Sequence, residues 1–75
     1  MKRYANLSGH SGVVAYETRR GAIVVEFQGG ERYTYTASSA GADAVAEMQQ
    51  LARAGRGLST YIARHRPGYE ERGPR

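Results

Sequence analysis

The sequence predicts an α+β domain in which a three-stranded antiparallel β-meander is followed by two helices packed on one face of the sheet. Residues 13–36 contain strand-forming segments separated by short glycine-containing turns, and residues 44–65 carry apolar side chains at helical spacing. The turns are short enough to close hairpins, so neighbouring strands are expected to be antiparallel. The apolar face of the resulting sheet must be covered, and the helices can cover it.

The first strand is expected at residues 13–18, ending at the turn signal Arg19-Arg20-Gly21. The second, residues 22–27, alternates in a way that predicts one fully buried face formed by Ile23, Val25 and Phe27. A two- or four-residue loop around Arg19 and Arg20 joins them. The pairs expected from such a loop are Tyr16 with Ile23, and Val14 with Val25.

The register of the next hairpin decides which face the two tyrosines of "ERYTYT" occupy. A two-residue Gly-Gly turn places Arg32 on the apolar face and both tyrosines on the other. A three-residue loop over 28–30, with Gly30 in a left-handed bulge, instead groups the tyrosine rings with the aliphatic side chains. Its pairs are Phe27 with Glu31, Val25 with Tyr33, and Ile23 with Tyr35. We prefer this register, so Tyr33 and Tyr35 are expected in the core.

Two helices are expected after the sheet. Ser38 or Ser39 is expected to cap the first, and Asp43 lies in its first turn, where the helix dipole favours an acid. Its core-facing stripe is Ala44, Val45, Met48, Leu51 and Ala52. Gly55 and Gly57 end this helix. The second begins near Ser59 and stops before Pro67, with a stripe of Leu58, Tyr61, Ile62 and His65.

The 75 residues are expected to form one domain over residues 11–69, with residues 1–10 loosely ordered and residues 70–75 a frayed polar tail. A core this small is marginal, and the chain has no cysteine to reinforce it. Self-association is therefore one expected route to stability. No segment is apolar enough to span a bilayer, so a soluble, cytoplasmic protein is expected.

The charge favours anionic partners. Eleven basic against seven acidic residues give a net charge of +4, and ten of the basic residues are arginine, which suits phosphate. The candidate phosphate- or nucleic-acid-binding residues are Arg53, Arg56, Arg64, Arg66, Arg19 and Arg20, and Lys2 and Arg3 at the N-terminus are expected to extend the same basic surface. Tyr69 and Tyr61 are the candidates for stacking on bases. The alternative is that the arginines are scattered over the surface.

Catalysis is not expected. His65 continues an apolar helical stripe, which is typical of a packed or capping histidine, and His10 lies in a glycine- and serine-rich segment that cannot hold it accurately. Glu70 and Glu71 are adjacent beside arginines, which favours solvation or ion pairing. No residue set predicts a metal site or a cofactor, and the glycine pairs do not match a phosphate-binding loop.

The arrangement of several residues resembles a known family. They are Tyr16, the alternating Ile23, Val25 and Phe27, then Gly30, Tyr33-Thr34-Tyr35, and a helix ending at Gly55 followed by Leu58 and Ile62. This order is similar to the KTSC domain, a short domain found at the C-terminus of some lysyl-tRNA synthetases and as free-standing bacterial and phage proteins. The chain departs from the family pattern where "ASSAG", Arg53, Leu58 and Ser59 replace a proline, a serine, an aromatic residue and an asparagine.

The resemblance covers about residues 11–69 and makes Tyr33 and Tyr35 a signature of the fold. It implies a family of unknown function for which RNA binding has been suggested. Three functions are therefore expected as alternatives: a small RNA-binding module, a protein–protein adaptor of a bacterium or phage, and a homo-oligomeric binder of a small nucleotide. The adaptor would use a free sheet edge or the face with Ala15, Val24 and Thr34.

Overall fold

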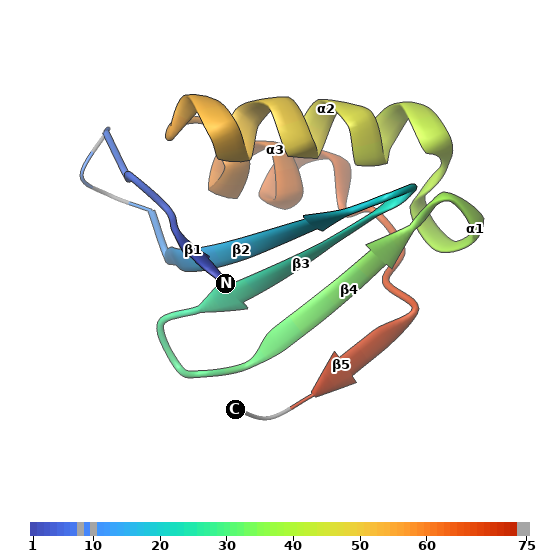
Figure 1. Cartoon of the computed structure of the whole chain (residues 1–75), viewed down its shortest axis with the longest axis horizontal. Helices are drawn as coiled ribbons and strands as arrows, with labels where there is room; N and C mark the ends of the chain where they lie inside the picture. The colour runs from blue at the N-terminus through green and yellow to red at the C-terminus, as the bar shows by residue number, and fades with distance from the viewer. Residues whose placement is uncertain (8, 10, 74–75) are drawn as a thin grey trace.

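The computed structural model describes residues 1–7, 9 and 11–73 of the chain. One antiparallel sheet has its strands in chain order, and both longer helices lie on one side of it (Figure 1). The strands are β1 (Lys2–Arg3), β2 (Val13–Arg19), β3 (Ala22–Phe27), β4 (Arg32–Thr36) and β5 (Glu71–Gly73). The helices are α1 (Ala37–Ala40), α2 (Ala42–Ala54) and α3 (Leu58–His65).

The prediction of an α+β fold with an antiparallel sheet is confirmed, but the number of strands is wrong. The sheet has five strands instead of three, because β1 pairs with β2 and β5 pairs with β4. Both edge strands lie in segments expected to be loosely ordered or frayed. Backbone groups make the ladder hydrogen bonds, so polar side chains do not exclude a short edge strand. The expectations for residues 8, 10, 74 and 75 lie outside the described residues.

The preferred register of the β3–β4 hairpin is confirmed. Val25 is opposite Tyr33, and Ile23 is opposite Tyr35. The three-residue loop is closed by a hydrogen bond from the Phe27 amide to the Glu31 carbonyl, at 2.9 Å. Gly30 has φ +91°, the positive value that a bulge at this loop position requires. The tyrosine rings therefore face the same side as the aliphatic residues of β3.

The expected register of the β2–β3 hairpin is wrong by two residues. Tyr16 lies opposite Val25 instead of Ile23, and the two-residue turn is Arg20-Gly21 instead of Arg19-Arg20. The reason is the turn: Gly21 adopts φ +70°, a conformation that an arginine in its place would adopt only at a cost.

An irregularity in β2 changes which valine is buried. The pairing with β3 shifts between Val13 and Ala15, so Val14 is the extra residue of a bulge. Val13, only 1% exposed, thus joins the core in place of Val14, which is half-buried.

The helices begin and end close to their predicted positions, except at the first N-cap. Neither Ser38 nor Ser39 caps α2: the side chain of Thr36 caps the single turn α1, and Ser39 completes a capping box with it. The cap lies earlier because Gly41 separates α1 from α2. α2 ends at Gly55 as expected. The described termini of α3 lie within a residue or two of the predicted ones.

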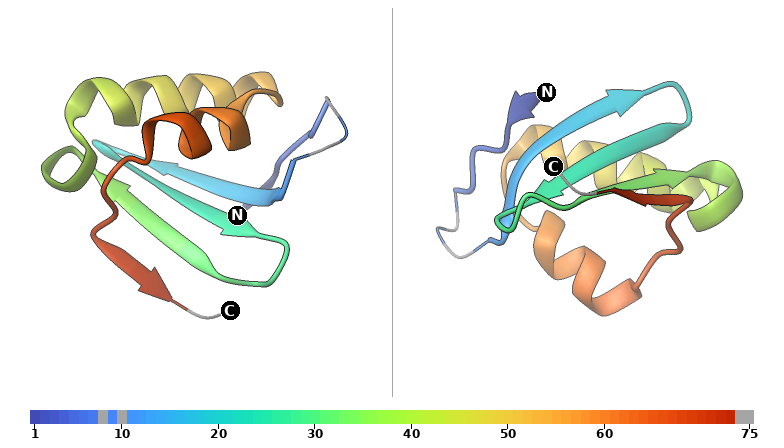
Figure 2. Two further views of the ribbon diagram at one scale, coloured as in Figure 1. Left: turned by 180° about the vertical axis from the view of Figure 1, so that it is seen from behind. Right: turned by 90° about the horizontal axis from the view of Figure 1, so that it is seen from below.

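The core lies between the helices and the sheet face that carries Tyr16, Ile23, Val25 and Tyr35. The predicted stripe of the first helix is confirmed as core: Val45, Met48 and Ala52 are buried. Seen from behind and from below, α2 and α3 cover this face, and none of the helices in the described part of the chain covers the other (Figure 2). Within the described residues, no helix has the length and apolarity needed to cross a membrane.

Candidate functional site

A groove with a volume of about 490 Å³ lies between β4 and the segment that follows α3. We call it the aromatic groove, because four of its lining residues are Phe27, Tyr33, Tyr35 and Tyr69. Ile62 and Pro67 add aliphatic surface, and Glu31 and Arg66 are its charged members.

Three ring pairs of the aromatic groove are edge-to-face: Phe27 with Tyr33, Tyr33 with Tyr69, and Tyr35 with Tyr69. Tyr33 contacts Phe27 edge-to-face at 5.4 Å between centroids and Tyr69 edge-to-face at 4.8 Å. Edge-to-face contacts of this kind stabilise a fixed arrangement of rings. Tyr35 is 2% exposed and forms the floor, whereas Tyr69 is 49% exposed. Tyr69 is therefore the ring with most surface available to a ligand.

The wall of the groove, residues 66–70, is positioned by backbone contacts. Arg66 caps α3 in the left-handed conformation, with φ +45°, and its amide donates to the Ile62 carbonyl. Gly68 packs so closely against α1 that a Cβ there would lie 2.4 Å from the Ser39 carbonyl oxygen. The Glu70 amide donates to the Thr34 carbonyl at 2.7 Å. These contacts place Arg66 and Tyr69 beside β4.

Strand β5 brings a further arginine to the rim. Arg72 pairs with Tyr33 across the strands, and its guanidinium carbon lies 5.6 Å from the centre of the Tyr33 ring. The guanidinium donates two hydrogen bonds to Oε2 of Glu31. This hydrogen bond, followed by the attraction of the carboxylate charge, raises the pKa of Arg72. Both side chains are about half exposed, so the ion pair orients Arg72 more than it stabilises the fold.

The buried position of Tyr35 also shifts its acidity. Desolvation, with smaller contributions from Tyr33 and Tyr69, raises the pKa of the Tyr35 phenol to about 12. The phenol is therefore neutral at physiological pH. Its chemistry in the groove is that of an apolar ring with a hydroxyl group, not that of a base.

Comparison with protein-family models, with curated proteins and with solved structures gave no match. The aromatic groove is thus interpreted from its own side chains. The resemblance to the KTSC domain stays a prediction.

Of the predicted binding residues, the structure brings Arg66 and Tyr69 together in the groove with Tyr33 and Tyr35. Arg64 is exposed on α3 and does not line it. Tyr61 is half-buried against the core, with its ring 4.3 Å from that of the exposed His65. The two rings are tilted by 30° to each other and lie along α3, outside the groove.

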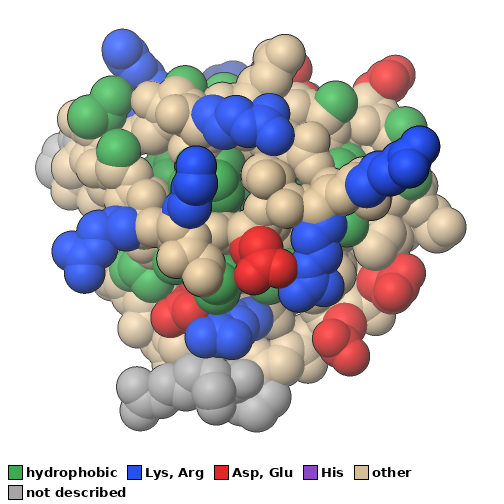
Figure 3. All heavy atoms as spheres, viewed as in Figure 1, with side chains coloured by type: hydrophobic (Ala, Val, Ile, Leu, Met, Phe, Trp, Pro, Cys, Tyr) green, Lys and Arg blue, Asp and Glu red, His purple; other side chains and the backbone are tan. Residues whose placement is uncertain are grey.

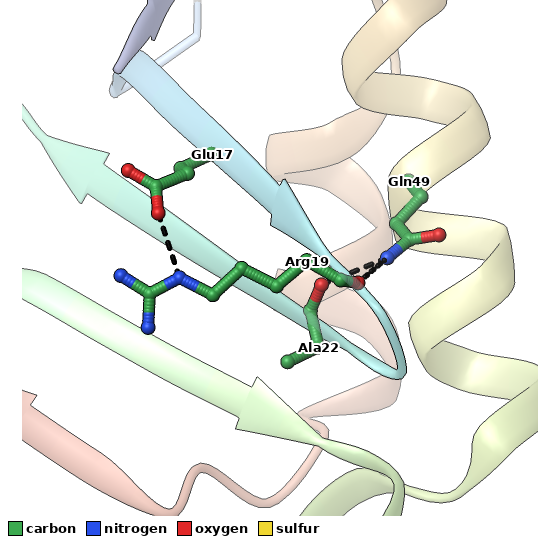
Figure 4. A network of polar contacts seen from close by, with 4 residues as sticks. All are labelled: Glu17, Arg19, Ala22 and Gln49. Atoms are coloured by element: carbon green, nitrogen blue, oxygen red, sulfur yellow. Dashed lines mark hydrogen bonds and ion pairs between the residues drawn. The ribbon is translucent and has the colours of Figure 1, made fainter.

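The other four predicted arginines lie elsewhere. Arg53 and Arg56 are exposed at the end of α2 and in the α2–α3 connection, which is the opposite end of α3 from Arg66. Arg20 is at the tip of the β2–β3 hairpin. Arg19 extends over the sheet face without helices and pairs with Glu17 at 2.6 Å, as Figure 4 shows. This pairing lowers the pKa of Glu17.

On the face shown in Figure 3, the basic side chains are spread over the surface and acidic side chains lie among them. Besides the Arg19 pair, Arg32 pairs with Glu26 at 3.1 Å on the face without helices. A second, more polar hollow of about 720 Å³ lies beside this pair, between β2 and the N-terminal segment. Arg3, Asn6 and Gln28 are among its lining residues.

Two lining residues of the groove, Phe27 and Glu31, and Arg72 at its rim were not among the predicted binding residues. Phe27 was expected in the core. The preferred hairpin register pairs it with Glu31, and this pairing indicates that both residues lie at the end of β4 next to Tyr33. Arg72 had no such signal, because its segment was expected to be a tail. Among the described residues, no cluster of three or more histidine and acidic side chains is placed to hold a metal ion.

Proposed function

We propose that the chain is a small basic module that binds single-stranded RNA, or another ligand carrying phosphate and a planar ring, in the aromatic groove without catalysis. One observation carries the proposal: the exposed ring of Tyr69 and the exposed guanidinium of Arg66 belong to the same groove. Aromatic stacking combined with arginine–phosphate contacts is how proteins bind single strands with little dependence on sequence.

The backbone at Arg66 supports this function. A left-handed residue that ends a helix is most often glycine, because a side chain makes the conformation costly. Here an arginine takes it, with φ +45°. Strain of this kind, where it is found at a groove, supports a binding role for the side chain.

The net charge of +4 and the resemblance to the KTSC domain are both in keeping with an anionic ligand. We extend the proposal to a KTSC-like, cytoplasmic protein. The adaptor and the homo-oligomeric nucleotide binder stay predictions. Light scattering, together with thermal unfolding with and without added nucleotide, distinguishes them, because only the oligomeric binder should be multimeric and gain thermal stability in a saturable way.

The proposal is tested by fluorescence anisotropy of a labelled single-stranded RNA of about ten nucleotides across a salt series. Tyr69→Ala should weaken binding roughly tenfold, because one stacked base is worth about 1–3 kcal/mol. Arg66→Gln should weaken binding and lower the slope of log affinity against log salt by about 0.7, the value for one phosphate contact on a single strand.

Arg20→Gln is the matched control, because it removes the same charge from the hairpin tip, away from the groove. It should leave the affinity within about twofold of wild type at moderate salt. Equal losses for Arg20→Gln and Arg66→Gln would mean that the arginines act only through net charge, and the proposed groove would be wrong. Absence of RNA binding at low salt would reject the function itself.

A further inference from the structure

The aromatic groove has opposite charges at its two ends. Glu31 immediately precedes β4, whereas the Arg66–Gly68 segment lies near α1, which immediately follows β4. The five residues of β4 span roughly 16 Å at about 3.3 Å per residue. This length accommodates a nucleotide that lies along the strand. A ligand with a negative end and a hydrogen-bond-donating end therefore has one favourable orientation.

The presence of Glu31 in a groove that binds phosphate needs an explanation, because a carboxylate repels a phosphate group. Part of the charge is compensated by Arg72, but both hydrogen bonds of Arg72 go to Oε2. Within the described residues, Oε1 of Glu31 accepts no hydrogen bond, and the side chain is 45% exposed. An ionised carboxylate only accepts hydrogen bonds, so Oε1 is suited to an N–H donor of the ligand.

We infer that Glu31 accepts a hydrogen bond from the base. The groove then selects nucleobases with an exocyclic amino group and binds cytosine more tightly than uracil. This inference rests on the proposed function. In the orientation it requires, the phosphate lies at Arg66 and the edge of the base lies at Glu31. The amino group of cytosine donates to Oε1, whereas uracil presents a carbonyl oxygen at the same position, and the two acceptors repel each other.

Cytosine and uracil are the best pair for the test because the rings have the same size and differ at that edge. Phosphate contacts carry no base information, so they cancel in the ratio of the two affinities. The measurement is the anisotropy of labelled oligocytidylate and oligouridylate of equal length at one salt concentration. Wild type should bind oligocytidylate about fivefold to tenfold more tightly, the effect of one charge-assisted hydrogen bond.

Glu31→Gln should bring this ratio close to one, because the amide can both donate and accept. Glu47→Gln, which removes the same charge from an exposed position on α2, should leave the ratio unchanged. Arg72→Gln distinguishes the contribution of Arg72 from that of Glu31, its partner in the ion pair. It keeps the carboxylate, so the preference for cytosine should persist even where the overall affinity falls.

Equal affinity of wild type for the two oligomers, or a preference that survives Glu31→Gln, would overturn the inference while leaving RNA binding intact. Loss of the preference in Arg72→Gln with its retention in Glu31→Gln would assign base reading to Arg72 instead. Failure of both oligomers to bind is a different result, because it rejects the proposed function and the inference together.

Discussion

Tyr33 and Tyr35 are two residues apart on β4 and face the same side of the sheet, yet their environments differ. Tyr35 is almost fully buried in the core, whereas Tyr33 lies among Phe27, Tyr69 and Arg72 and keeps partial exposure. Their rings are nearly parallel, with 6.4 Å between centroids. Tyr35 therefore supports the fold, whereas Tyr33 contributes both to the fold and to the groove.

Tyr35→Phe should change the alkaline stability more than the neutral stability. The folded-state pKa of Tyr35 is raised to about 12, above its usual value of 10.0. Stability that depends on the neutral phenol is therefore fully present below about pH 10 and is lost as the pH rises through about 12. Removing the hydroxyl should make the alkaline decline less steep.

The measurement is the urea midpoint of both proteins at about pH 8 and about pH 11. At the lower pH the variant should stay within about 1 kcal/mol of wild type, since no hydrogen bond of the Tyr35 hydroxyl to a described residue is lost. Identical alkaline declines for Tyr35→Phe and wild type would contradict the assigned role of Tyr35.

The helix layer is joined to the sheet by a polar contact as well as by its apolar stripe. The side-chain amide of Gln49 on α2 donates to the Arg19 carbonyl at 2.9 Å and to the Ala22 carbonyl at 2.8 Å, as Figure 4 shows. These carbonyls flank the Arg20-Gly21 turn. One helix residue thus holds both strands of the hairpin where they meet.

Gln49→Ala should lower the free energy of unfolding by about 1–2 kcal/mol, because two hydrogen bonds to the turn are lost. Gln50→Ala is the control, because Gln50, the next residue on α2, is exposed. It should change stability by no more than about 0.5 kcal/mol. Chemical denaturation measures both. Equal effects of the two substitutions would show that the contact to the turn does not contribute.

Segments far apart in the chain close the molecule at its other end. Tyr4 follows β1 and is 3% exposed, and its hydroxyl accepts a hydrogen bond from the Leu58 amide at the start of α3. The Leu7 amide donates to the Gly55 carbonyl at 2.7 Å. The Gly55 backbone approaches Ala5 so closely that a Cβ would lie 2.7 Å from the Ala5 Cβ. Residues 4–7 are therefore part of the packed structure.

Tyr4→Phe should destabilise the fold by about 1–2 kcal/mol, because it leaves the buried Leu58 amide without its partner. Tyr16→Phe is a suitable comparison, since Tyr16 is also buried but its hydroxyl makes no hydrogen bond to a described residue. Thermal unfolding of both variants provides the measurement. A smaller loss for Tyr4→Phe than for Tyr16→Phe would contradict the role of the Tyr4–Leu58 hydrogen bond.

Several features of the fold were predictable because neighbouring residues determine them. The alternation of β3 and the left-handed glycine at Gly30 were sufficient for the β3–β4 register. The apolar stripe and Gly55 were sufficient for α2 and its end. The β2–β3 register was missed because both Arg19-Arg20 and Arg20-Gly21 form plausible turns, and the bulge at Val14 has no composition signal.

The sequence by itself determined the meander, the two longer helices and the shared face of Tyr33 and Tyr35, since these depend on periodicity and on local backbone preferences. Only the tertiary structure decided that residues 66–73 return to β4 and place Arg66, Tyr69 and Arg72 beside those tyrosines. The physical reason is that this return depends on backbone hydrogen bonds and on the close approach of Gly68 to Ser39. Such contacts leave no pattern of apolar side chains in the chain.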